Sequence, residues 1–386
     1  MTQTKKRTLK SARTDTHERA VIKKSSIDIE FLSVVIILLT FGLIMVFSAS
    51  YPSANYKYGD GLYFIKKQAI WAVLGFAAMV ITMKIDYRVY KKFALPIGFV
   101  TLVLLGMVFI FPAYNGAHRW IGIGSLSFQP SEMAKIAVII YLAASLSVVK
   151  DKIRDFSVLI KHLVMVGIVL GLLYVEPHLS VCIIIAIVAF IMLMVSGARF
   201  KQFMGLGLLG LPVVGYLAVK EGYRMDRIVT FFDPFQDRLG DGWQIIQSLY
   251  AIGSGGLFGL GFGNSRQKYM YVSEPQNDFI FAIICEELGI IGAAVIIALF
   301  AILIWRGMKI AMNAPDLFGS LLVTGIVSLV GVQTFLNIAV VTKMIPTTGI
   351  SLPFFSAGGS SLVFLMAAMG MVLNVSKYKK QVVDLW

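Results

Sequence analysis

The segment Ser273–Gly289, SEPQNDFIFAIICEELG, places one acid, Asp278, directly before a long apolar run and two more, Glu286 and Glu287, inside it. The apolar run extends over Phe279–Ile304, and a helix needs roughly 20 such residues to cross the hydrocarbon core of a bilayer. A carboxylate inside a membrane segment is costly unless it is paired or faces a wet cavity. The segment therefore predicts a membrane-spanning helix with a specific reason to keep acids at its start and two to three turns further in.

The composition of the whole chain is that of an integral membrane protein. Of its 386 residues, 58% are hydrophobic and only 15% are charged, whereas about 25% of residues in soluble domains are charged. The net charge of +14 is carried by short basic clusters between apolar runs. This is the pattern of membrane-protein loops, and it argues against a nucleic-acid partner. Cys182 and Cys285 lie far apart in apolar stretches, which predicts neither a metal site nor a disulfide framework.

Apolar runs of membrane-spanning length recur ten times along the chain. Val158–Val175 and Leu179–Ser196 are two spans, because a single helix over both would be nearly twice as long as the bilayer core is thick. Pro177 between them also breaks a helix. We therefore expect an all-α polytopic fold with ten transmembrane helices, over Ile29–Ser50, Phe64–Met83, Phe93–Pro112, Ser131–Val149, Val158–Val175, Leu179–Ser196, Gln202–Val219, Phe279–Ile304, Ser320–Val341 and Gly359–Ser376.

Basic residues in the connections predict the orientation of these spans. Lys and Arg gather in an N-terminal tail over 1–28, in alternate connections and in a C-terminal tail over 377–386, so both termini are expected to be cytoplasmic. The ten-helix domain between them, 29–376, then has Asp278 at its outer surface after seven crossings. Long connections in compact domains are usually functional. Three are expected on the outer face, including a large loop over 220–278: Ala113–Pro130, Lys220–Asp278 and Thr342–Gly358.

The first outer connection, HRWIGIGSLSFQPSEMAK, carries candidate ligands for an anion. Pro130 and Ser131 before an apolar run predict a helix start. Glu132 and Lys135, spaced i and i+3, share one face of that helix and can pair. Two interpretations follow: a plain ion pair at a helix start, or an outward cavity into which Arg119 and Lys135 project to hold an anion.

Two further acids and one irregular segment have similar alternatives. Glu176, at the Pro177 break, either caps the break in interfacial water or lines a cavity. Asp278 is either an N-cap, which is a favoured position for aspartate, or a functional acid. The segment KMIPTTGISLPFFSAGGSSL, Lys343–Leu362, predicts irregular backbone at membrane depth. Such backbone must pack inside protein or line a wet cavity.

The glycine-rich stretch GSGGLFGLGFG, residues 253–263, matches neither the Walker A nor the dinucleotide-binding pattern. It predicts close backbone approach near the interface, and the following Arg266 and Lys268 could face an anionic head group. The spacing of polar residues shows no Cys–His or Ser–His–Asp arrangement. Residue types alone therefore leave a transporter, a channel and a lipid-processing enzyme open.

Taken together, these motifs resemble the SEDS family of bacterial membrane proteins over nearly the whole chain, closest to its FtsW and SpoVE branch. The matching segments are RWIGIGSLSFQPSEMAK, GWQIIQSLYAIGSGGLFGLG, DFIFAIICEELG and TGISLPFFSAGGSS. The resemblance implies a peptidoglycan glycosyltransferase that polymerises lipid II, a disaccharide-pentapeptide on undecaprenyl pyrophosphate, at the outer face of the cytoplasmic membrane. It also implies action at the division or sporulation septum, a class B penicillin-binding protein as transpeptidase partner, and other divisome or sporulation membrane proteins as neighbours.

The resemblance also assigns roles to residues. The essential aspartate of the family falls on Asp278, and substrate-binding positions fall on Arg119, Glu132, Lys135, Glu176, Ser356, Gly358 and Ser360. The chain departs from the family pattern at His178, where Asp is usual, and at Ala357, where Tyr is usual. These departures weaken any role for a second acid at the Pro177 break.

The chemistry of such a reaction suits a single carboxylate. Glycosidases need an acid to protonate a poor leaving group, but pyrophosphate leaves as a stable anion and needs charge neutralisation instead. Asp278 is then expected to be the general base, with Arg119 and Lys135 as pyrophosphate contacts. No cofactor is identified; a divalent cation, Mg²⁺ or Mn²⁺, is compatible with the chemistry, although no metal-ligand spacing identifies a site. A lipid II flippase and a non-catalytic division scaffold are the alternatives.

Overall fold

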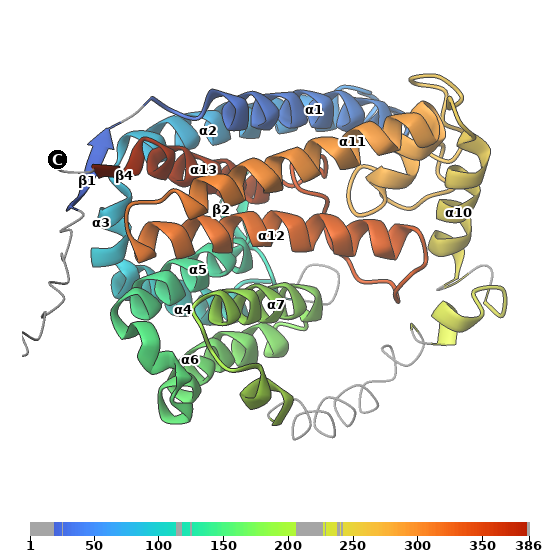
Figure 1. Cartoon of the computed structure of the whole chain (residues 1–386). Coiled ribbons are helices and arrows are strands. Elements are labelled where there is room, and N and C mark those ends of the chain that lie inside the picture. Colours follow the sequence, from blue (N-terminus) through green and yellow to red (C-terminus); the bar gives the residue numbers. More distant parts are fainter. Residues whose placement is uncertain are drawn as a thin grey trace, which may run out of the picture.

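The computed structural model describes residues 19–24, 26–112, 118–123, 126–205, 227, 229–237, 240 and 242–383. Most of these residues are helical (Figure 1). The helices are α1 (Ile29–Tyr58), α2 (Tyr63–Lys84), α3 (Tyr87–Lys92), α4 (Ala94–Met107), α5 (Pro130–Val149), α6 (Phe156–Val175), α7 (Leu179–Val195), α10 (Trp243–Gly255), α11 (Ile280–Met312), α12 (Leu317–Val341) and α13 (Gly359–Ser376), with short 3₁₀ turns at Val108–Ile110 and Lys150–Arg154.

Seven helices in the described ranges are long and apolar enough to cross a membrane: α1, α2, α5 with its following 3₁₀ turn, α6, α11, α12 and α13. Two shorter apolar helices, Ala94–Ile110 and Leu179–Val195, coincide with two further predicted spans. The break expected at Pro177 is present, since α6 ends at Val175 and α7 begins at Leu179. The remaining predicted span, Gln202–Val219, lies almost wholly outside the described residues.

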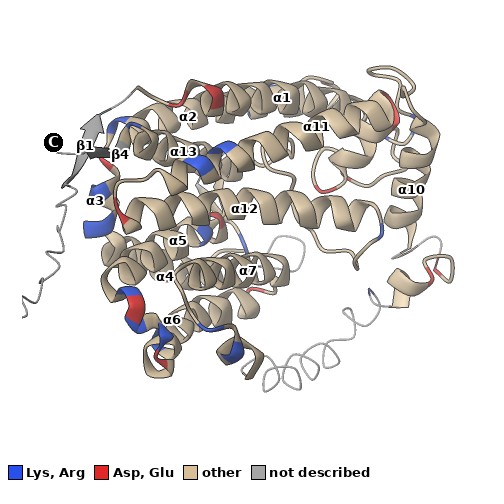
Figure 2. Cartoon of the chain, viewed as in Figure 1, with Lys and Arg blue, Asp and Glu red and all other residues tan. Residues whose placement is uncertain are grey.

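The bundle is arranged around α12, which packs against α5, α7 and α11. Of the most apolar 18-residue window of α12, 72% is buried, against 28% for α6 and α11. A helix that is apolar all round is buried in protein or spans a membrane, and the exposed apolar faces of α6 and α11 suit contact with lipid. Figure 2 shows charged residues mainly where helices end, and α12 and α7 carry none.

Two small antiparallel sheets modify the all-α expectation. Strand β1 (Arg19–Lys24) pairs with β4 (Tyr378–Val383), which brings the two tails of the chain together. Strand β2 (Ile121–Ile123) pairs with β3 (Leu126–Phe128) in the connection that precedes α5. Figure 1 shows β1 and β4 at one end of the bundle and α10 at the opposite end. The pairing agrees with termini on one side of a membrane; that this side is the cytoplasm stays a prediction.

Helix α11 differs from the single regular span predicted at Phe279–Ile304. Its backbone leaves the helical region at Gly289, with φ 69° and ψ −172°. This conformation is open to glycine and strained for other residues. The backbone of the glycine-rich stretch lies directly against it: Leu260 N–H and Gly261 N–H donate to the carbonyls of Glu286 and Glu287, at 2.9 and 3.0 Å. The close approach predicted for these glycines is therefore present, and a break in α11 accompanies it.

Candidate active site

Asp278 lies on a cavity of about 370 Å³ at the α10 end of the bundle. The wall is assembled from segments far apart in the sequence: the start of α10, the residues before α11 and the connection between α12 and α13. The lining residues are Arg227, Gly240, Trp243, Gln244, Ser273, Asp278, Phe279, Thr347, Thr348 and Gly349. Sequence reasoning identified Asp278 among these but missed its neighbours, because nothing in their spacing brings Thr347–Gly349 to Asp278.

The structure excludes one of the two interpretations of Asp278. The N-cap position of α11 is occupied by Phe279, and no side chain caps this helix end. The half-buried Asp278 carboxylate instead lies beside Gly349, where an added Cβ would be 2.9 Å from Asp278 Oδ2. The capping interpretation is therefore wrong, and the role of Asp278 as a functional acid stays a prediction.

The surroundings of Asp278 favour its protonated form. Burial, reinforced by the nearby negative charge of Glu274 and opposed by Arg227, raises the pKa of Asp278 to about 6. Catalytic bases work best when their pKa lies close to the operating pH. Asp278 is therefore a carboxylate that can both take up and hold a proton near neutral pH.

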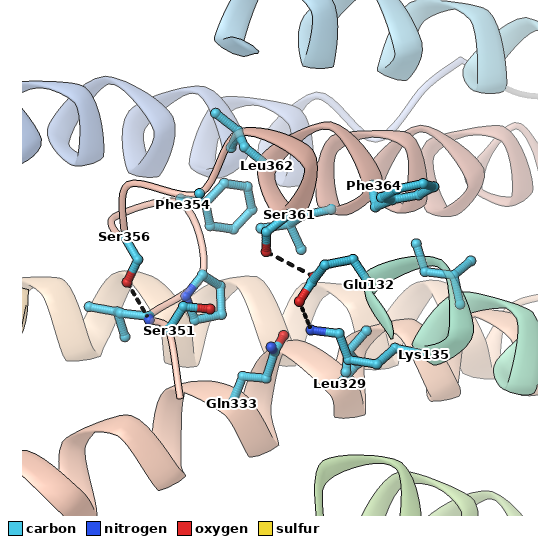
Figure 3. A pocket seen from close by; sticks show the side chains of 15 residues that line it. Glu132, Lys135, Leu329, Gln333, Ser351, Phe354, Ser356, Ser361, Leu362 and Phe364 are labelled. Carbon is cyan, nitrogen blue, oxygen red and sulfur yellow. Dashed lines mark hydrogen bonds and ion pairs between the residues drawn. The ribbon is translucent and has the colours of Figure 1, made fainter. Parts of the chain in front are cut away.

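A second and much smaller cavity, of about 30 Å³, lies beside the Glu132–Lys135 pair (Figure 3). The pair predicted from the i, i+3 spacing is present, with 2.8 Å between Lys135 Nζ and Glu132 Oε1, and both side chains are almost completely buried. The Ser361 hydroxyl donates to Glu132 Oε2 at 2.9 Å, and Gln333 faces the pair from α12. Two charges that are mutually neutralised and hydrogen-bonded can persist in such a setting.

Of the other predicted substrate residues, two lie at this second cavity. Ser356 and Gly358 line it. The Ser356 hydroxyl accepts from Leu352 N–H at 2.7 Å and donates to the Asn277 carbonyl at 2.8 Å. Ser360 is buried at the start of α13 and accepts from Gln129 N–H at 3.3 Å. It lines neither cavity.

Arg119 and Glu176 meet outside both cavities. The Arg119 guanidinium donates to the backbone carbonyls of Glu176 and Pro177. Glu176 is completely buried, and neither of its carboxylate oxygens has a hydrogen-bond partner among the described residues. The structure therefore brings Arg119 to the break between α6 and α7, and it does not bring Arg119 to Asp278.

The two acids inside the apolar run have a structural explanation. Glu286 accepts from Arg266 N–H at 3.0 Å and from the Ser265 hydroxyl. Glu287 pairs with Lys268 at 2.8 Å, and Ser48 of α1 donates to it at 2.7 Å. Both glutamates are fully buried. They hold the connection that follows the glycine-rich stretch against α11.

This arrangement corrects the interpretation of Lys268 as a contact for an anionic head group. Lys268 is 3% exposed, and its charge is neutralised by Glu287. The local sequence could not reveal this pairing, because the carboxylate lies 19 residues away and in a different element.

Comparison with known proteins gives the family. The FtsW/RodA/SpoVE family model, described as "Cell cycle protein", matches residues 29–381. The chain is 45% identical over 364 residues to stage V sporulation protein E of Bacillus subtilis, covering 93% of this chain and 99% of that protein. It is 44% identical over 363 residues to the probable peptidoglycan glycosyltransferase FtsW of Trichlorobacter lovleyi, covering 93% of this chain and 95% of that protein.

A solved structure has the same fold. A chain from "Structural coordination of polymerization and crosslinking by a peptidoglycan synthase complex" superposes with a TM-score of 0.75 at 27% identity, covering 91% of this chain and 97% of that chain. Fold and span composition define a multi-pass membrane protein. The chain belongs to the FtsW/RodA/SpoVE family, and the resemblance to the SEDS family, nearest its FtsW and SpoVE branch, is confirmed.

Proposed function

We propose that this protein is a peptidoglycan glycosyltransferase that polymerises lipid II at the outer face of the bacterial cytoplasmic membrane. Relatives over nearly the full chain carry the glycosyltransferase name. The assignment to a site depends on one observation: Asp278 is a half-buried carboxylate that lines a cavity and does not cap α11. A membrane enzyme whose substrate has a lipid tail and a polar head needs such a site where spans meet outer loops.

In this mechanism Asp278 takes the proton from the 4-hydroxyl of the acceptor sugar. The oxygen attacks the anomeric carbon of the donor with inversion, and the bond to undecaprenyl pyrophosphate breaks. General-base assistance of this kind is worth roughly 10²–10⁴-fold in rate. The proton remains on Asp278 until it is released to water.

The pyrophosphate needs positive charge as it leaves. Arg227 is the one cation among the described residues that line the Asp278 cavity, and it donates to the Thr347 carbonyl at 3.0 Å. We therefore add Arg227 to Arg119 and Lys135 as a candidate contact. Lys135 would act from the second cavity, together with Glu132, Ser356 and Gly358.

A divalent cation stays a prediction. The acids close to this cavity are Asp278 and Glu274, and the described residues contain no group of three or more His, Cys, Asp or Glu side chains arranged to hold a metal. No step of the mechanism above passes through a cation.

The structural neighbour comes from a peptidoglycan synthase complex. This origin supports a proposed partnership with a class B penicillin-binding protein, which would cross-link the new strands. The names of the relatives support a site of action at the division or sporulation septum. Other membrane proteins of those assemblies are the further partners we propose.

The test is polymerisation of lipid II by purified protein in liposomes, with and without a cognate class B transpeptidase. We expect glycan strands from the wild type, and a loss of at least about 100-fold for Asp278→Asn because the base is removed. Wild-type polymerisation by Asp278→Asn would remove Asp278 from this role. Lipid II translocation without polymer would instead support the flippase, and retained cell division by Asp278→Asn would support the scaffold.

A further inference from the structure

Three consecutive backbone carbonyls lead into α11, and each accepts a hydrogen bond of 2.8 Å from the α12–α13 region. The Gln276 carbonyl accepts from Ala357 N–H. The Asn277 carbonyl accepts from the Ser356 hydroxyl, and the Asp278 carbonyl accepts from the Asn337 side-chain amide. The backbone that carries the proposed base is therefore held from outside its own element, residue by residue.

Asn337 differs from the other two donors, Ala357 and Ser356, because its amide donates to a second backbone carbonyl near Asp278. It lies on α12, is 1% exposed, and its amide nitrogen also donates to the Ile350 carbonyl at 2.7 Å. An amide nitrogen has two hydrogens, so both are used. Ile350 directly follows Gly349, the residue against which Asp278 Oδ2 lies. Asn337 thus binds the backbone on both sides of the contact between carboxylate and glycine.

The orientation of the Asn337 amide follows from its partners. Two carbonyl oxygens face Nδ2, so a flipped amide would set its own oxygen against both of them. Asn337 Oδ1 has no hydrogen-bond partner among the described residues. A buried polar atom without a partner is unfavourable, so the side chain is retained here for its two donated bonds.

We propose that Asn337 is a positioning residue that, together with Ser356, holds Asp278 in the orientation needed to take the acceptor proton. The inference rests on the proposed function of Asp278 as the base. Ser356, predicted to bind substrate, acts here through the backbone of Asn277. Loss of either side chain would let the segment before α11 shift, and a displacement of about 1 Å in an active site can cost about 100-fold in rate.

The experiment uses the full-length protein in liposomes and varies lipid II concentration and pH. Asn337→Leu keeps the side-chain size and removes both donors; Asn337→Asp keeps the shape and replaces the amide by a carboxyl group. The matched control is Thr324→Val on the same helix. Thr324 is equally buried, but its hydroxyl donates to the Ser320 carbonyl of α12 itself.

We expect both Asn337 variants to lose about 10- to 100-fold in kcat, with KM for lipid II within about twofold of wild type. In a plot of kcat against pH, the midpoint of the fall on the acid side reports the pKa of the base. For Asn337→Leu this midpoint should move down, from about 6 toward the ordinary aspartate value of about 4, because the released carboxylate reaches water. A purely structural role would lower the amount of folded protein without moving this midpoint. Thr324→Val should match the wild type.

Unchanged kcat and an unchanged midpoint in Asn337→Leu would overturn the inference. So would a raised KM with kcat intact, since that would make Asn337 a substrate contact. If the Asn337 variants do not elute as folded protein in size-exclusion chromatography, Ser356→Ala decides by the same two readouts. Asp278→Asn is run in parallel: full activity there refutes the proposed function itself, whereas an inactive Asp278→Asn beside a normal Asn337→Leu refutes only the positioning role.

Discussion

Asp278 combines three properties that residue type alone does not confer. It is half-buried, it lies beside an acid, Glu274, and it makes no N-cap although aspartate favours that position. Each property follows from packing around the cavity. The result is a carboxyl group whose pKa is raised to about 6, so it ionises within the range in which bacteria grow.

The raised pKa of Asp278 predicts a pH dependence of both activity and stability. Polymerisation needs the ionised base, so activity should fall about tenfold per unit as pH drops below about 6. A carboxyl group with a raised folded-state pKa favours folding while it is protonated, and this contribution is lost as pH rises through that pKa.

Asp278→Asn should therefore unfold at a higher temperature than the wild type at pH 7.5, and the difference should shrink at pH 5. Thermal unfolding in detergent at the two pH values measures this. An equal difference at both pH values would mean that Asp278 has an ordinary pKa in the folded protein.

At the scale of elements, the connection between α10 and α11 is held by buried charge. Glu286 and Glu287 project from the first turns of α11 and bind Ser265, Arg266 N–H and Lys268. The glycine-rich stretch then fits against the break at Gly289, where an added Cβ would lie 2.4 Å from Gly259 N. These contacts fix the connection that leads to Asp278.

Removing one partner of the buried Lys268–Glu287 ion pair should lower the free energy of unfolding. Lys268→Met leaves Glu287 buried without its cation, and a change of this kind destabilises by about 3–5 kcal/mol. The double variant Lys268→Met, Glu287→Gln should recover part of that loss, because no charge is left uncompensated. Thermal unfolding of the three proteins in detergent gives the comparison.

The exposed pair Lys66–Asp60 provides a matched control. Its atoms are also 2.8 Å apart, but the side chains are 63% and 42% exposed. Solvent screens exposed pairs, which contribute little to stability, so Lys66→Met should leave the unfolding temperature nearly unchanged. A Lys268→Met protein as stable as Lys66→Met would contradict the role assigned to the buried pair.

At the scale of the whole molecule, the tails and the Asp278 cavity lie at opposite ends of the bundle. Strands β1 and β4 join the tails at one end, and α10 borders the cavity at the other. The basic clusters predict that the tail end is cytoplasmic. The proposed reaction requires the cavity end to face outward.

Cysteine labelling in intact cells tests this orientation. In a background with Cys182 and Cys285 replaced, Ser273→Cys at the cavity should react with a membrane-impermeant maleimide. Asn313→Cys, exposed at the far end of α11, should react only after permeabilisation. The reverse pattern would place Asp278 inside the cell, away from the side on which glycan strands are assembled.

The sequence by itself determined nine helical segments, the break at Pro177 and the Glu132–Lys135 pair, and it predicted a catalytic role for Asp278. Each of these depends on residues close together in the chain: the length of an apolar run, a missing backbone donor, an i, i+3 spacing, a short motif. Local patterns of this kind indicate which residues of a segment face lipid, protein or water, and they do not depend on how the helices pack together.

Only the tertiary structure decided that Asp278 faces a cavity, that Glu286 and Glu287 bind a connection, and that Asn337 holds the backbone of Asp278. The partners in these contacts are far apart in sequence, 59 residues in the case of Asn337 and Asp278. A buried polar group must find some partner, but the packing of the helices selects which one. A polar residue in an apolar segment therefore predicts that some hydrogen-bond partner exists, but only the packed helix bundle shows which residue that partner is.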